Sequence, residues 1–429
     1  MNPIINKATH NTSTNNRSKR NLLALVLITS LFFFWGFVHN LDPVLIPHLK
    51  RAFSLSDLET ALIDFSVFIA YFIMALPAGF LMKKYGYKFG IILGLLLFSV
   101  GSFLFIPAAN TGVYFFFLAA LFVLACGLAF LETAANPYVI ALGDAESASQ
   151  RLNFAQSFNG LAAFLAPVVG GKFILSDSTL SENELARMLP LAKEQFLMSE
   201  AATVKGPYAI LGALILLIAV LFMFIKLPDI KDNGTEDEKT SIAKAFLHRH
   251  LKFAIISQFF YVGAQVCVLS FFIRFASSSA ELTSSSASWY AGGAGLAFMI
   301  GRFIGTFFMR YVAPNVLLFI YALLSVLLTL VAVFSQGIIT VYALICVSFF
   351  MSIMFPTIFS LGITGLGKDT KIGSSLIVMA IVGGAMMPLL LGYISDQTGS
   401  IQYGFLVPVA CFFVVFLFGF RFWKPVLNR

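Results

Sequence analysis

The stretch GVYFFFLAALFVLACGLAFLETAANPYVIAL, residues 112–142, decides the fold. It is almost wholly apolar and contains one charged side chain, Glu132. The run exceeds the ~20 residues that a helix needs to cross a ~30 Å hydrocarbon core. Backbone amides in hydrocarbon must be hydrogen bonded within their own segment, so this stretch is predicted to be a transmembrane helix.

The rest of the chain has the same character. Of its 429 residues, 59% are hydrophobic and 11% are charged, and the mean hydropathy is +0.90. These values exclude an ordinary soluble protein. We therefore predict an all-α membrane protein with 12 transmembrane helices, at residues 21–49, 59–83, 89–109, 112–142, 151–175, 207–227, 252–276, 287–311, 314–334, 338–366, 372–394 and 401–423.

The charged residues lie mainly between these segments and set the orientation. Most Lys and Arg residues fall in loops that share one side when the N-terminus is cytoplasmic, so the positive-inside rule places both termini in the cytoplasm. We expect a disordered tail at 1–20, an N-terminal half at 21–227, a cytoplasmic linker at 228–251, a C-terminal half at 252–423 and a tail at 424–429.

An internal repeat supports the division into halves. The sequence GFLMKKY from Gly79 aligns with GTFFMRY from Gly305, so that glycine, cation and tyrosine coincide at the ends of the second and eighth segments. Duplication of a six-helix unit predicts two pseudo-symmetric halves with the binding site in the cleft between them.

Ionisable side chains at membrane depth are candidates for function, because an unpaired charge there is costly. Glu132 is the sharpest case: burial disfavours its charged form, so we expect it to bind and release a proton, and the alternative is a structural carboxyl group. Asp42 precedes Pro43, which should break the helix, and it either takes part in coupling or caps the helix in water. Asp64 faces the same choice. Arg302 lies in the eighth segment.

Amide side chains follow one face of the fifth segment. Asn153, Gln156 and Asn159 recur every three residues, an array that suits sugar hydroxyl groups, although polar stripes also join helices. We expect Asn159 to bind ligand and Asn153, nearer the cytoplasmic end, to be structural. Further candidate binding residues are Trp35, His39, Asn40, Asn136, Tyr261 and Gln265.

Several other functions are disfavoured by the sequence. Its four cysteines lie in apolar segments without a CxxC pair, so we expect neither disulfides nor a metal site. The histidines show no metal-ligand spacing, which argues against an enzyme, and we expect no cofactor. The cations are scattered, so no nucleic-acid partner is expected. A membrane sugar receptor that does not transport remains an alternative.

Six motifs resemble the fucose permease branch of the major facilitator superfamily. They are FLETAANP (130–137), RLNFAQSFN (151–159), YVGAQ (261–265), GRFIGT (301–306), MSIMFPTIFSLGI (351–363) and GSSLIVM (373–379), and the likeness spans residues 21–423. The resemblance implies symport of a neutral monosaccharide with a proton as the coupling ion, by alternating access. It also implies that Glu132 is the acidic position of helix 4 and that Asn159 is a ligand position.

The resemblance implies L-fucose as the substrate, with glucose, galactose or N-acetylglucosamine as alternatives. The family's helix 1 aspartate corresponds to Pro43 here, so either Asp42 or Asp64 is expected to replace it. We expect a monomer in the inner membrane of a bacterium, with the sugar, the proton and the lipid bilayer as its partners.

Overall fold

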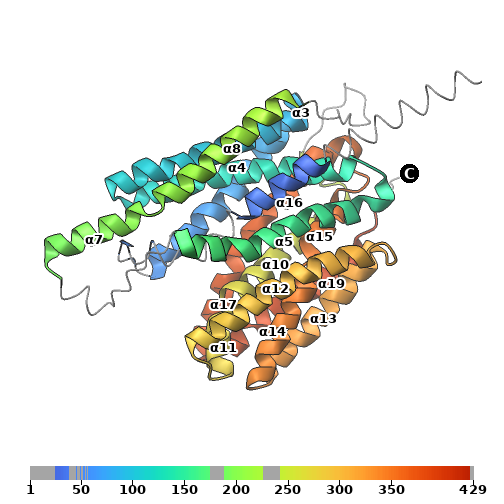
Figure 1. Cartoon of the computed structure of the whole chain (residues 1–429). Coiled ribbons are helices and arrows are strands. Elements are labelled where there is room, and N and C mark those ends of the chain that lie inside the picture. Colours follow the sequence, from blue (N-terminus) through green and yellow to red (C-terminus); the bar gives the residue numbers. More distant parts are fainter. Residues whose placement is uncertain are drawn as a thin grey trace, which may run out of the picture.

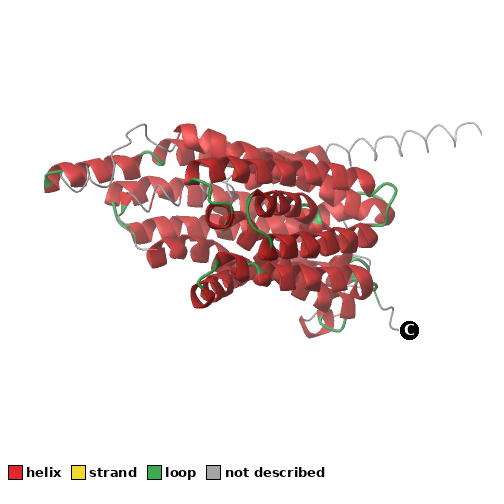
Figure 2. Ribbon diagram, turned by 90° about the horizontal axis from the view of Figure 1, so that it is seen from below, coloured by secondary structure: helices red, strands yellow, loops and turns green. Residues whose placement is uncertain are grey.

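The computed structural model describes residues 25–37, 45, 49, 52, 53, 55, 57–173, 188–225 and 242–425. Helices are the only regular secondary structure in these ranges (Figure 2). The predicted tail at 1–20, most of the predicted linker at 228–251 and the last residues of the chain lie outside them. His39, Asn40 and Asp42 also lie outside the described residues.

The described residues of the first half form five long or moderately long helices. They are Leu25–Phe37, α3 (Asp57–Thr111), α4 (Tyr114–Ala141), α5 (Ala148–Phe173) and α8 (Lys205–Phe224). At 55 residues, α3 is far too long for one crossing. It contains a non-helical kink at Gly86, whose φ of 81° favours glycine, so α3 holds the two spans predicted at 59–83 and 89–109.

The second half has more interruptions. Its main helices are α10 (Arg249–Ser270), α11 (Phe272–Ser279), α12 (Ser284–Phe308), α13 (Pro314–Phe334), α14 (Ile338–Met351), α15 (Met354–Ile363), α16 (Thr370–Met379), α17 (Gly383–Thr398) and α19 (Leu406–Leu417). Shorter elements are α18 (Ile401–Gly404) in this half, α9 (Ile242–Ala245) in the predicted linker and α7 (Pro190–Ala202) in the first half. Each predicted span in this half coincides with one or two of these helices.

Among the described residues, nine helices are long and apolar enough to cross a membrane. One of them, Leu62–Thr111, covers two predicted spans, and the helix Leu25–Phe37 is a shorter apolar helix. Every one of the twelve predicted spans overlaps a described helix, so these ranges are consistent with twelve crossings.

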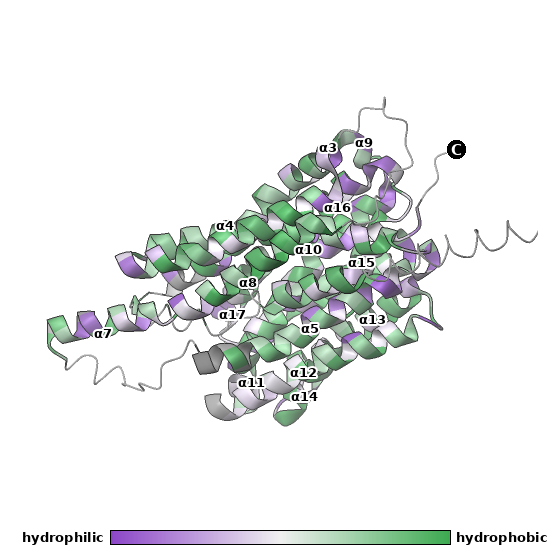
Figure 3. Ribbon diagram, turned by 45° about the horizontal axis from the view of Figure 1, so that its top comes forward, coloured by the Kyte–Doolittle hydropathy of each residue, from purple (hydrophilic) through white to green (hydrophobic). Residues whose placement is uncertain are grey.

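The helices form two groups with α5 and α16 between them (Figure 1). One group contains α3, α4 and α8, and the other contains α10, α12, α13, α14 and α19. We call the end that carries α9 and the C-terminus the inner end, and the end that carries α7 and α11 the outer end (Figure 3). Hydrophobic residues dominate the middle of the helices, whereas hydrophilic residues gather at the inner end and on α7.

Two prolines interrupt backbone hydrogen bonding where the halves meet. Proline has no N–H group, so it leaves the carbonyl group four residues earlier without its helical donor. Pro137 lies inside α4, and the carbonyl group of Thr133 instead accepts a hydrogen bond of 3.1 Å from Ser374 Oγ in α16. Pro356 follows the break between α14 and α15, and the carbonyl group of Ser352 there accepts a bond from Arg302.

Candidate functional site

A cavity of about 100 Å³ lies between the two halves. Each half contributes six residues to its lining: Trp35, Phe68, Tyr71, Glu132, Gln156 and Asn159 from the first, and Val262, Gln265, Val266, Arg302, Phe355 and Ile381 from the second. The two sets differ in character, because the first carries the carboxyl group and two amides and the second is largely apolar. A ligand in this cavity would contact both halves.

Glu132 is the carboxylic acid of the cavity and is only 5% exposed. It lies in the middle of α4, with apolar residues before it that hold this part of the helix inside the protein. Its carboxyl group accepts a hydrogen bond from the Tyr71 side chain and interacts with the side chain of Asn136 and the charge of Arg302. A buried carboxyl group with polar neighbours is therefore placed where a ligand would bind.

A chain of amides continues from Asn136 into the cavity. Gln156 Nε2 donates to Asn136 Oδ1 over 3.1 Å, which fixes the Gln156 side chain. The Asn136 side chain is buried and lies beside the carboxyl group of Glu132, with which it interacts. Asn159 is held by the neighbouring helix: a Cβ atom on Gly36 would lie 2.7 Å from Asn159 Cγ, so only glycine allows this approach.

Arg302 connects the halves and is 3% exposed. Its Nε atom donates to the Ser352 carbonyl group over 2.8 Å, and its Nη1 atom donates to the Gln156 carbonyl group over 2.7 Å. The guanidinium group also lies 4.7 Å from the centre of the Phe298 ring, a cation–π distance. These contacts fix a planar guanidinium group at the edge of the cavity, close enough to Glu132 for an electrostatic interaction.

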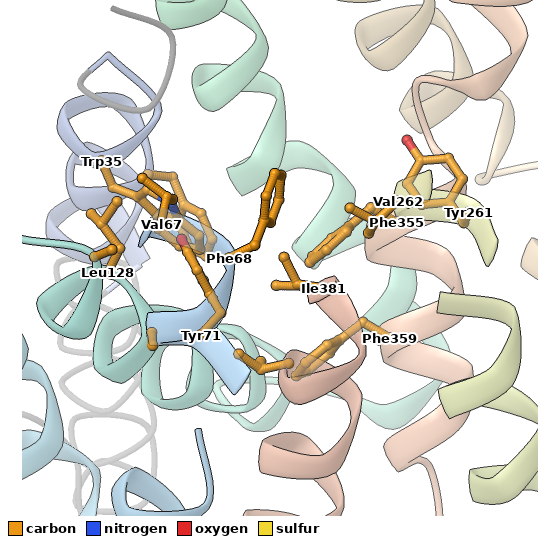
Figure 4. Close-up of a cluster of buried hydrophobic side chains, with 14 of the residues drawn as sticks. Trp35, Val67, Phe68, Tyr71, Leu128, Tyr261, Val262, Phe355, Phe359 and Ile381 are labelled. Atoms are coloured by element: carbon orange, nitrogen blue, oxygen red, sulfur yellow. The ribbon is translucent and has the colours of Figure 1, made fainter. Parts of the chain in front are cut away.

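Apolar side chains form the rest of the wall (Figure 4). Trp35, Phe68 and Tyr71 lie on one side, and Val262 and Phe355 lie on the other, with Ile381 between the groups. Trp35 stacks on Phe32 with 5.1 Å between the ring centres. Such a wall can pack against the C–H face of a sugar ring while the amides and the carboxyl group bind its hydroxyl groups.

The inner side of the cavity is closed by bonds between the halves. Ser149 Oγ and Ser360 Oγ lie 2.7 Å apart, and Asn153 Nδ2 donates to Thr357 Oγ1 over 3.1 Å. The bond from Ser374 to Thr133 lies on the same side. Lys371 adds a cation–π contact, with its Nζ atom 5.0 Å from the centre of the Tyr87 ring. In this conformation, the halves are therefore joined at the inner end.

The structure brings together five of the predicted site residues: Trp35, Glu132, Gln156, Asn159 and Gln265 line one cavity. Asn136 lies directly behind them, bonded to Gln156. Tyr261 does not line the cavity, because its hydroxyl group donates to the Met351 carbonyl group over 2.9 Å. Asp64 is exposed and lies one turn from Phe68 toward the outer end, on the same face of α3.

Seven of the lining residues were not predicted as site residues: Phe68, Tyr71, Val262, Val266, Arg302, Phe355 and Ile381. The sequence analysis named Arg302 only as an ionisable residue of the eighth segment. Its position deep in a membrane helix was a sufficient reason to predict it as a site residue. Val262 and Val266 flank Gln265 at helical spacing, a pattern that could have found them. Tyr71, Phe355 and Ile381 carry no such local signal, because they reach the cavity through the packing of separate helices.

The chain belongs to the Major Facilitator Superfamily, whose pattern matches residues 23–371. It is 41% identical over 409 residues to the L-fucose-proton symporter of Escherichia coli K12, which covers 94% of this chain and 93% of that protein. It is also 40% identical over 413 residues to a glucose/galactose transporter of Brucella abortus strain 2308, covering 95% and 96% of the two chains.

Solved structures give the same relationship. A crystal structure of the Major Facilitator Superfamily transporter FucP in the outward conformation matches with a TM-score of 0.88 and 41% sequence identity. The match covers 95% of this chain and 100% of that one. The predicted fold class and the predicted resemblance are thereby confirmed, and the chain is a membrane transporter rather than an enzyme.

Proposed function

We propose that this protein carries a neutral monosaccharide across a bacterial inner membrane together with a proton, with L-fucose as the leading substrate. The placement of Glu132 carries this proposal: a buried carboxyl group shares one cavity with the amides of Gln156, Asn159 and Gln265. Proton binding at Glu132 would change the charge of the site that the sugar enters. The relatives named as an L-fucose-proton symporter and a glucose/galactose transporter support the same class of cargo.

The composition of the cavity favours an uncharged, polyhydroxylated cargo. Among the described lining residues, Arg302 is the one cationic side chain, and its charge is partly compensated by the nearby carboxyl group of Glu132 and by two backbone carbonyl acceptors. Amide groups can both donate to and accept from hydroxyl groups. The apolar residues Val262, Val266 and Ile381 suit the methyl group that distinguishes a 6-deoxyhexose such as L-fucose.

A glucose or galactose carrier is the second candidate, favoured by the 40% identity to the Brucella abortus transporter. These sugars carry a hydroxymethyl group where L-fucose carries a methyl group. Gln265 offers the polar contact that such a group would need, because it lies beside Val262 and Val266 in the largely apolar half of the cavity. N-Acetylglucosamine is a third cargo that the resemblance allows.

We infer that the observed conformation is open toward the outer end. The hydrogen bonds between the halves lie at the inner end. The halves also pack closely at Gly384 of α17, where a Cβ atom would lie 2.7 Å from Phe68 Cε1 of α3. Rocking of the halves about the cavity would break these bonds and open the inner side. Proton and sugar would then enter from outside and leave inside.

We further propose that both termini are cytoplasmic, so that the inner end faces the cytoplasm. Both halves of the chain contribute to the cavity, and we propose that a monomer carries out transport. The proton is the coupling ion, and no other cofactor is required by the proposed mechanism. Glu132 would hold the coupled proton, and the choice between Asp42 and Asp64 as a second acidic group stays a prediction. Asp64 lies one turn from the lining residue Phe68, toward the outer end.

Uptake into proteoliposomes tests this function. Purified protein would be reconstituted with an imposed pH difference, acid outside, and presented with labelled L-fucose, glucose, galactose and N-acetylglucosamine. We expect accumulation of L-fucose above its outside concentration, and collapse of the accumulated pool when a protonophore is added. Sugar fluxes that are indifferent to the pH difference would refute symport, and preferential accumulation of glucose would select the second candidate.

A further inference from the structure

A second cavity, of about 450 Å³, opens between α5 and α12 at the inner end. It is separate from the central cavity and shares no lining residue with it. The first half contributes Gln150, Arg151 and Phe154, and the second half contributes Phe303, Thr306 and Arg310, among others. Transport as proposed above does not use this cavity.

Two arginines give this cavity a positive charge. Arg151 donates to the carbonyl groups of Val139, Asp144 and Ile140 over 3.1, 3.0 and 2.5 Å and to Ser147 Oγ over 2.6 Å, so its guanidinium group is held in place and offers an anion mainly its charge. Asp144 is the acidic residue that interacts electrostatically with Arg151. Arg310 has no ion pair with any residue in the described ranges, and its guanidinium carbon lies 6.0 Å from the centre of the Phe307 ring. The cavity thus offers a net cationic site with one uncompensated guanidinium group.

Exposed aromatic rings surround these cations. Phe154, Phe303 and Phe307 line the cavity and are 44%, 38% and 51% exposed. Tyr311 follows at the end of α12 and is 74% exposed, which is the position of an aromatic residue at a membrane–water interface. A small soluble anion would be bound by the two arginines alone and would make no use of the aromatic rings. Cations beside rings that face the lipid suit a molecule with an anionic head and an acyl chain.

We propose that this cavity binds the phosphate headgroup of an anionic phospholipid between Arg151 and Arg310, with its acyl chain along Phe154 and Phe303. Both halves form the walls, and Gln150 Nε2 already donates to the Thr306 carbonyl group across them over 3.4 Å. A headgroup held by an arginine of each half strengthens this contact. The lipid therefore stabilises the conformation in which the inner end is closed.

Competition between lipids tests the site. The full-length protein in detergent would receive equal amounts of phosphatidylglycerol and phosphatidylethanolamine, and retained lipid would be counted by native mass spectrometry. We expect phosphatidylglycerol to be preferred, and Arg310→Gln to reduce that preference about fivefold, the effect of one basic residue at an anionic headgroup. Arg310→Lys should keep most of it. Arg274→Gln is the matched control, because Arg274 is an exposed arginine of α11 at the outer end.

Stabilisation gives a second readout. Phosphatidylglycerol should raise the melting temperature of the wild type and of Arg274→Gln more than that of Arg310→Gln. Equal retention of the two lipids by the wild type would overturn the proposal without reference to any variant. An unchanged preference in Arg310→Gln would do the same. Displacement of phosphatidylglycerol by millimolar inorganic phosphate would identify a site for a soluble anion instead.

Discussion

The Nη1 atom of Arg302 donates to the backbone carbonyl group of Gln156 over 2.7 Å, so a side chain of the second half is bonded to the main chain of the first. The same guanidinium group bonds Ser352 through Nε. The Gln156 side chain lines the cavity, so ligand binding and contact between the halves meet at one residue. Changes that alter this link should affect both stability and transport.

Arg302→Lys tests the geometry of this link apart from its charge. A lysine keeps the positive charge but cannot direct two planar donors at carbonyl groups on opposite sides. We expect the free energy of unfolding to fall by about 1.5–3 kcal/mol, because one hydrogen bond from a charged donor is lost. The melting temperature should therefore fall, and uptake should be slower. Arg274→Lys, at an exposed position near the outer end, should leave both unchanged. A normal melting temperature for Arg302→Lys would contradict the structural role.

Glu132→Gln tests proton coupling. Glutamine keeps the shape and hydrogen-bonding capacity of the protonated acid but cannot release a proton, so uphill uptake should vanish while sugar exchange in counterflow persists. Uptake by the wild type should grow with the imposed pH difference, and that of the variant should not. Glu146→Gln is the control, since Glu146 is exposed in the loop before α5. Persistent pH-driven accumulation in Glu132→Gln would remove this residue from coupling.

Ser374→Ala tests the closure of the inner end. The change deletes the donor to the Thr133 carbonyl group and costs the closed state about 0.5–1.5 kcal/mol. Spin labels at Glu146 and Tyr311, one on each half, should report a larger share of long distances. Ser348→Ala removes an equally buried hydroxyl group whose bond to Leu344 stays within α14, so it should not change the distance distribution. Identical distance distributions for Ser374→Ala and Ser348→Ala would show that the bond from Ser374 to Thr133 does not hold the inner end closed.

Gln258→Leu tests a buried amide without a partner in the described part of the chain. No described residue forms a hydrogen bond with Oε1 or Nε2 of Gln258 in this conformation, which costs on the order of 1–3 kcal/mol per group. Gln258 lies one turn before Val262 on the cavity face of α10, toward the inner end. We expect Gln258→Leu to raise the melting temperature and to slow transport, because the amide gains partners when the inner end opens. A lower melting temperature would disprove this account.

Gly79→Val tests the packing of the halves below the cavity. A Cβ atom at Gly79 would collide with Ser375 Oγ and would lie 3.1 Å from the Lys371 carbonyl oxygen in α16. The halves should separate at the inner end, which the spin labels described above can detect. Gly292→Val in α12 is the control, because no atom of another helix in the described residues lies within 4 Å of its Cβ position. Unchanged distances in Gly79→Val would show that this contact does not hold the inner end closed.

The helices could be predicted from the sequence because membrane depth sets the length of an apolar run. The interruptions were harder to predict. The break at Ser352 follows from Pro356, but the prediction placed one continuous helix at 338–366. A proline tells which carbonyl group is freed, yet it does not tell which donor will reach that group. That donor is Arg302, fifty residues away in sequence, and only the packing of α12 against α14 brings them together.

The site was predictable where several polar residues share one helix. Gln156 and Asn159 recur on α5, and both line the cavity. Tyr261 was predicted from the same kind of spacing, but its hydroxyl group bonds Met351, because helix phase does not say which neighbour a side chain will meet. The apolar half of the cavity escaped prediction for another reason: Phe355 and Ile381 look like any other apolar residue of a membrane helix.

The prolines of α4 and α15 separate two tasks that a transporter must combine. The acceptors that they free are main-chain oxygens, so exchanging the side chain of Thr133 or Ser352 does not delete them. Substrate selectivity can therefore be changed at the side chains of Gln156 or Gln265 while these main-chain hydrogen bonds are kept. Attempts to change the cargo should leave Pro137 and Pro356 in place. A residue with an N–H group at either position would bond the carbonyl group of Thr133 or Ser352 within its own helix, and the contact of that carbonyl group with another helix would be lost.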